Sequence, residues 1–114
     1  MRIWHNRNPE TFTPPGHFGG LAVANLVPLA GNDFSVQIST APPGGGGELH
    51  HHEAWSQVFF VLSGELTFDT GAERFTLQAG QAVLFEPKDP HATLNEGTGD
   101  SVSLVITVDH ARRP

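Results

Sequence analysis

The stretch Gly44-Gly45-Gly46-Gly47-Glu48-Leu49-His50-His51-His52-Glu53 places three of the chain's seven histidines side by side. In an extended strand, successive side chains alternate between the two faces, so His50 and His52 project together while His51 points the other way. Two imidazoles on one face make half of a metal site. The stretch therefore predicts that a second half lies elsewhere in the chain, on a fold that brings the two halves together.

Short apolar runs separated by turn residues occupy most of the remaining sequence. The 13 glycines and 9 prolines suit many short strands joined by tight turns, and no window has a convincing helical period. Besides the extended stretch from residue 49, we expect strands over residues 21–29, 34–40, 57–62, 66–69, 74–77, 82–85, 91–95 and 102–108. This pattern predicts an all-β barrel or jelly roll, an architecture that closes or covers its strand edges.

Three local patterns make more detailed predictions. Residues 34–40 alternate apolar and polar, so Phe34, Val36 and Ile38 are expected to face the core. Residues 57–62 are apolar on both faces and are expected to be covered on both sides. Residues 44–47 lack the Lys and Ser/Thr of a phosphate-binding loop, so we interpret them as a flexible loop.

Size and charge limit the class of protein. A chain of 114 residues and 12.3 kDa predicts a single domain over residues 1–114. Twelve acidic and six basic residues give a net charge of -6, which argues against nucleic acid as a partner. No apolar run is long enough to cross a bilayer, so we expect a cytoplasmic protein with no membrane partner.

Two further features of the sequence lead to expectations: it has no cysteine, and its first residues contain several prolines and glycines. Without cysteine, any metal must be held by nitrogen and oxygen atoms. Residues 1–20 are interpreted as an N-terminal arm that could add a strand to the exposed sheet edge of a second copy. A homodimer is therefore expected.

Two spaced motifs resemble those of the cupins, a family of small β-barrel proteins. In the first motif, Gly44, His50, His52 and Gly64 match at the family spacings, and Gln57 stands where the family has Glu. In the second motif, the matching residues are Gly80, His91 and Asn95, listed here in chain order. The proline of the second motif is displaced by one position, and Lys88 replaces its inner glycine. The two motifs span residues 44–95.

The resemblance implies a single-domain cupin barrel with one divalent transition metal, Fe, Zn, Ni or Mn, bound by His50, His52, Gln57 and His91. Imidazole nitrogens with one oxygen donor suit such ions. A structural alternative is that these histidines only hydrogen-bond to one another inside the barrel. His51 is expected to face outward and not to bind.

Gln57 departs from the family pattern in a way that changes the charge of the site. An amide oxygen removes no charge from a bound ion, whereas a carboxylate would remove one unit, so an anionic substrate should be held more strongly. The alternative is that Gln57 orients a histidine or a water and does not touch the metal.

The catalytic candidate outside the motifs is His17, in the arm sequence Pro14-Pro15-Gly16-His17. If the arm folds over the mouth of the barrel, His17 could act as a general base, a role that an amide such as Gln57 cannot fill. The alternative is a surface histidine in a loop.

The function implied by the resemblance is that of a metal-dependent enzyme acting on a small organic acid, sugar acid or diketone. The chemistry would be either that of a dioxygenase or a redox-neutral isomerase or lyase reaction. A non-catalytic cupin module that binds a metal or metabolite is the alternative.

Overall fold

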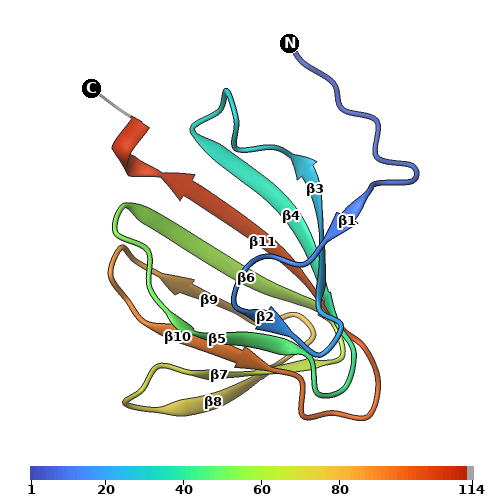
Figure 1. Cartoon of the computed structure of the whole chain (residues 1–114), viewed down its shortest axis with the longest axis vertical. Helices are drawn as coiled ribbons and strands as arrows, with labels where there is room; N and C mark the ends of the chain where they lie inside the picture. Colours follow the sequence, from blue (N-terminus) through green and yellow to red (C-terminus); the bar gives the residue numbers. More distant parts are fainter. Residues whose placement is uncertain (113–114) are drawn as a thin grey trace.

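Two antiparallel sheets face each other in the computed structural model, which describes residues 1–112 (Figure 1). The six-stranded sheet has the order β1 (Thr11–Phe12), β3 (Ala22–Val27), β4 (Phe34–Ala41), β11 (Ser101–Asp109), β6 (Trp55–Ser63) and β9 (Ala82–Phe85). The five-stranded sheet has the order β2 (His17–Phe18), β5 (Gly46–His50), β10 (His91–Leu94), β7 (Glu65–Asp69) and β8 (Arg74–Gln78). The 3-10 turn η1 (His110–Arg112) follows the last strand. The all-β prediction is confirmed.

The N-terminal arm joins both sheets of its own chain. Strand β1 pairs with β3, and β2 pairs with β5, where His17 lies opposite Gly47. A turn at Pro15 and Gly16 separates the two short strands. The arm therefore supplies two strands that the sequence did not predict, and it adds them to the sheets of this chain.

The face of β4 that points inward is the opposite of the one that we predicted. Phe34 is 45% exposed, whereas Ser35 is buried and Gln37 and Ser39 line an internal cavity. The inner face of this strand is thus polar, and Val36 lies with Phe34 on the outer face. The prediction was wrong because it assumed a dry apolar interior, and a cavity accepts polar side chains where a packed core does not.

Residues 57–62, which we predicted to be covered on both faces, lie in β6 and are covered only on the inner face. In β6, Gln57 and Val61 are buried on the inner side, whereas Phe60 and Leu62 are 37% and 45% exposed on the outer side. The apolar outer residues of the six-stranded sheet thus have no covering layer within residues 1–112.

The apolar core fills one part of the space between the sheets. Its buried members are Val61, Leu66, Phe68 and Phe85, and Phe59 packs against them. The ring of Phe68 lies 5.4 Å from Phe59 and 5.5 Å from Phe75, measured between centroids. This core also contacts the ring of His91, through Phe59 and Phe85.

The run of four glycines differs from the flexible loop that we predicted, because Gly46 and Gly47 belong to β5 and Gly44 and Gly45 form a hydrogen-bonded turn before it. A Cβ at Gly46 would lie 2.0 Å from the carbonyl oxygen of Thr93, so only glycine permits β5 and β10 to pair there. Asn95 holds the start of the run, because its backbone bonds to Gly44 and Gly45 at 2.8 and 2.9 Å. Three strands meet at these glycines, and side chains would separate them.

No helix within residues 1–112 has the length and apolar character needed to cross a membrane.

Candidate metal centre and cavity

His50, His52 and His91 converge inside the barrel. Each offers a ring nitrogen, and these three nitrogens lie within 4.8 Å of one another. The ring centroids of His50 and His91 are 4.6 Å apart, and those of His50 and His52 are 4.9 Å apart. The spacing that singled out these three histidines in the sequence corresponds to one cluster in space.

Strand pairing and backbone contacts set the direction of two of the rings. His50 on β5 lies directly opposite His91 on β10. The Nδ1 of His50 bonds to the carbonyl oxygen of Glu48 at 2.7 Å, and the Nδ1 of His91 bonds to that of Asp89 at 3.2 Å. Because a carbonyl oxygen can only accept, both Nδ1 atoms must carry the proton, and the Nε2 lone pairs are left free to bind a metal.

His52 reaches the cluster from the turn after β5, not from the strand itself. Its carbonyl oxygen accepts a 2.7 Å hydrogen bond from the backbone N–H of Lys88, and its ring lies 4.6 Å from that of Trp55. Lys88 has a φ of 72°, a left-handed conformation that glycine adopts more readily. This explains the glycine of the family motif at that position, and here the turn keeps its shape with lysine.

Burial keeps the most enclosed histidine neutral. His91 is 2% exposed, and its ring stacks on Phe85 at 4.4 Å between centroids. Burial lowers the pKa of His91 to about 4. The pKa of His52 is also lowered, by burial and then by the nearby His50, while Gln57 acts in the opposite direction. Neutral imidazoles are the form that binds a metal.

Unpartnered polar atoms in the buried cluster fit a metal. The Nε2 of His91 and the Oε1 of Gln57 are buried and have no hydrogen-bond partner. The Nε2 of Gln57 donates to the Oγ1 of Thr107 at 3.0 Å, which directs the amide oxygen away from that hydroxyl. A buried acceptor without a partner is costly, and an ion bound by both atoms would remove the cost.

His51 and His17 lie in different places relative to the cluster. His51 is exposed and bonds to the carboxylate of Glu53 at 2.7 Å, outside the cluster. His17 lies beside the cluster, with its ring centroid 6.0 Å from that of His50. The Nδ1 of His17 bonds to the carbonyl oxygen of Pro15 at 3.0 Å, so the Nε2 of His17 carries a lone pair.

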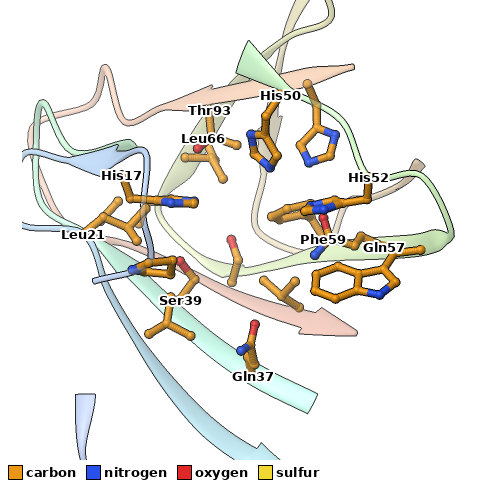
Figure 2. A pocket seen from close by; sticks show the side chains of 18 of the residues that line it. His17, Leu21, Gln37, Ser39, His50, His52, Gln57, Phe59, Leu66 and Thr93 are labelled. Atoms are coloured by element: carbon orange, nitrogen blue, oxygen red, sulfur yellow. The ribbon is translucent and has the colours of Figure 1, made fainter. Parts of the chain in front are cut away.

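A cavity of about 250 Å³ opens next to the three histidines. Figure 2 shows His50 and His52 on one side of it, Gln37 and Ser39 on the other, and His17 extending into the same hollow. Phe59 of β6 lines this cavity, whereas Val61, on the same face of the strand, belongs to the apolar core. Gln57, which we predicted to bind the metal, and Trp55 also line it.

Sequence reasoning missed the serines of the cavity wall. Ser101 and Ser103 on β11 line the cavity, each is 1% exposed, and neither Oγ atom has a partner. The strand expected over residues 102–108 excluded Ser101, and its sequence carried no sign that Ser103 points inward.

Comparisons with known proteins agree with the fold. Residues 37–108 match the family profile described as "Cupin domain". A protein of Thermotoga maritima named "Oxalate-binding protein" is 27% identical over 67 residues, which is 59% of this chain and 55% of that protein. The match thus spans about half the length of that relative.

Solved structures extend the likeness over nearly the whole chain. A predicted oxalate decarboxylase from Thermotoga maritima has a TM-score of 0.82 at 23% identity, with 96% of this chain and 99% of that chain covered. KdgF from a Halomonas species has a TM-score of 0.78 at 18% identity, with 99% and 96% covered. The polyketide cyclase RemF from Streptomyces resistomycificus has a TM-score of 0.78 at 21% identity, with 100% and 82% covered. At these identities the likeness shows a shared fold.

Proposed function

The chain belongs to the cupin domain family, and from this premise we propose that it is an enzyme that uses one divalent transition metal to act on a small organic acid. The observation that carries the proposal is the convergence of His50, His52 and His91, whose ring nitrogens lie within 4.8 Å beside a cavity of about 250 Å³. We propose Gln57 as the fourth metal-binding residue, on the strength of its buried and unpartnered amide oxygen.

The charge of the donor set favours an acid as substrate. Three neutral imidazoles and an amide leave the full charge on a divalent ion. When bound, the ion would act as a Lewis acid and attract a carboxylate or enolate oxygen. Within the described residues the cavity has no lysine, arginine or carboxylate in its wall, so no other fixed charge competes with this attraction.

His17 is the proposed proton-transfer residue. Its Nε2 lone pair is available because its Nδ1 donates to Pro15, and its ring lies beside His50 in the cavity wall. A neutral imidazole there can accept a proton from a carbon or hydroxyl of the substrate and return it elsewhere. This favours a redox-neutral isomerase or lyase reaction on a sugar acid, diketone or similar acid over a dioxygenase reaction.

A second candidate is a cupin that binds a metal and a metabolite without turnover. The matching relative from Thermotoga maritima is named for binding oxalate and not for a reaction. Calorimetric binding of an acid together with no consumption of that acid by the metal-loaded protein would favour this candidate.

Metal content tests the proposed site directly. We expect His91→Ala to lose the stoichiometric metal that the wild type holds, because His91 is the most buried of the three ligands. His51→Ala is the matched control and should retain the metal, since His51 bonds to Glu53 outside the cluster. Gln57→Ala should weaken metal binding roughly 10-fold to 100-fold. Elemental analysis and chelator competition provide the readouts, and full metal retention by His91→Ala would refute the site.

Reaction type is tested on the metal-loaded wild type. A panel of hydroxy acids, keto acids and diketones is followed by chromatography and by oxygen uptake. Product formation without oxygen uptake is the expected result. Oxygen consumption coupled to substrate loss would instead support a dioxygenase.

A further inference from the structure

We propose that the cavity holds a second anchoring site, formed by Ser39, Ser101 and Ser103, that binds the hydroxyl groups of an uncharged tail on the ligand. The proposal rests on the proposed function, in which the acidic end of the ligand binds at the histidine cluster. It adds the class of ligand: a chelating acid that carries a hydroxylated carbon chain.

The serine hydroxyls form a continuous patch by strand geometry. Ser101 and Ser103 are two residues apart on β11 and therefore point to the same side of the sheet. Ser39 on β4 is the direct cross-strand neighbour of Ser103, a position at which Cβ atoms lie about 5 Å apart. All three residues line the cavity of the metal centre.

Two of these hydroxyls are buried without any hydrogen-bond partner. Ser101 and Ser103 are each 1% exposed, and their Oγ atoms are unpartnered. A buried hydroxyl without a partner is unfavourable, and a ligand that bonds to it would remove this cost. The next inward residue of the strand is Val105, so an apolar side chain is tolerated on this face. Packing alone therefore does not explain the serines.

Within residues 1–112, the cavity wall at the serines carries no charged side chain, and this determines which ligand groups it can bind. A hydroxyl both donates and accepts, so it matches the hydroxyls of a ligand, whereas a second carboxylate would need a cation. Residues of the described part of the chain place no lysine or arginine in the wall. A cavity of about 250 Å³ suits a small metabolite and is larger than a two-carbon acid alone would fill.

A matched pair of acids tests the anchoring site on the metal-loaded protein. Glycolate and gluconate share the same α-hydroxycarboxylate end, and only gluconate carries a hydroxylated tail. Calorimetric titration of the wild type should show gluconate binding at least roughly tenfold more tightly than glycolate, because one to three additional hydrogen bonds form.

Serine variants then test whether these hydroxyls cause the preference for gluconate over glycolate. Ser101→Ala and Ser103→Ala should each weaken gluconate binding roughly threefold to tenfold and leave glycolate binding unchanged. Ser35→Ala is the control, since Ser35 is buried on the same sheet but does not line the cavity. Metal content and melting temperature of each variant establish that it is folded and loaded.

The outcomes distinguish the two proposals. Equal binding of the two acids by the wild type, or a gluconate preference that survives in both serine variants, would overturn the anchoring site and leave the metal-centred function standing. Loss of glycolate binding in the serine variants would also overturn it. Absence of stoichiometric metal in the wild type, or no binding of either acid, would overturn both.

Discussion

His91 is the most buried histidine of the candidate metal cluster. Its ring lies between aromatic neighbours, stacked on Phe85 and edge-on to Phe59 at 5.8 Å between centroids. These rings offer no hydrogen bond to a charged imidazole, so burial lowers the pKa to about 4. The burial that keeps this imidazole neutral at neutral pH thus makes His91 a source of instability in acid.

The depressed pKa of His91 predicts that the metal-free protein loses stability as the pH falls. The unfolded chain takes up a proton near pH 6.5 and the folded chain only near pH 4, so the unfolded state binds more protons between these values and is favoured there. We expect this residue to lower the free energy of unfolding by about 2 kcal/mol between pH 7 and pH 5. Urea unfolding at the two pH values measures the change.

His91→Gln is the control for that titration. Glutamine does not titrate, so the stability difference between pH 7 and pH 5 should shrink by about the same amount. An unchanged difference in this variant would show that other groups cause the acid sensitivity.

The arm strand β2 is the element that completes the site. Its pairing with β5 brings His17 opposite Gly47, and a Cβ at Gly47 would lie 2.8 Å from Cδ2 and Nε2 of the His17 ring. Glycine at this position thus leaves the space in which the imidazole sits. The ring position depends on two segments that are thirty residues apart in the sequence.

Gly47→Ala is expected to displace the His17 ring without removing the metal. With the substrate that the acid panel identifies, kcat should fall by about 100-fold, as in His17→Ala, since a general base is typically worth that much. Gly99→Ala is the control, because no atom lies within 4 Å of a Cβ built there. Side-chain NMR of His17 gives a readout besides activity. Wild-type kcat in Gly47→Ala would contradict the role of His17.

A strand could be predicted from the sequence when its own residues or a neighbouring turn carry a signal, and not when only a distant pairing partner makes it a strand. The hairpin of β7 and β8 follows from local turn residues, and its strands appear within one residue of the expected bounds. The short strand β2 has no alternating pattern of its own, since it consists only of His17 and Phe18. It becomes a strand through its pairing with Gly46 and Gly47, which no local signal reveals.

At the scale of the whole molecule, the six-stranded sheet has an apolar face that no other part of residues 1–112 covers. By cross-strand register, Phe60 lies between Leu104 and Ala82, and Leu104 is paired with Ile38 on the other side. Their face of the six-stranded sheet also carries Leu84, which is 54% exposed. An exposed apolar face can pack against the same face of a second copy, so we propose a homodimer formed through it.

Substitution on this face predicts a change of oligomeric state. The wild type should have twice the chain mass of 12.3 kDa by light scattering, and Phe60→Lys should have the mass of one chain because it places a charge in the interface. Phe60 is 37% exposed, so the core of each barrel should stay intact. Leu49→Lys, at an exposed leucine of the other sheet, should remain dimeric. A monomeric wild type would contradict the proposed interface.

The sequence by itself determined the all-β fold class, most of the longer strands and the positions of the clustered histidines. These features depend on alternation and on motif spacing, which are local properties of a chain. His50, His52 and His91 could be selected because the spacings of the two motifs mark them, although His52 lies just beyond the end of β5.

Only the tertiary structure decided which face of each strand lines the interior. Alternation marks two faces of β4 and β11, but it identifies the inner one only if the interior is dry and apolar. Here the interior includes a cavity, so Ser39, Ser101 and Ser103 face inward while apolar side chains face outward. The contact of His17 with this cavity likewise depends on pairing between distant segments, which the order of residues along the chain does not record.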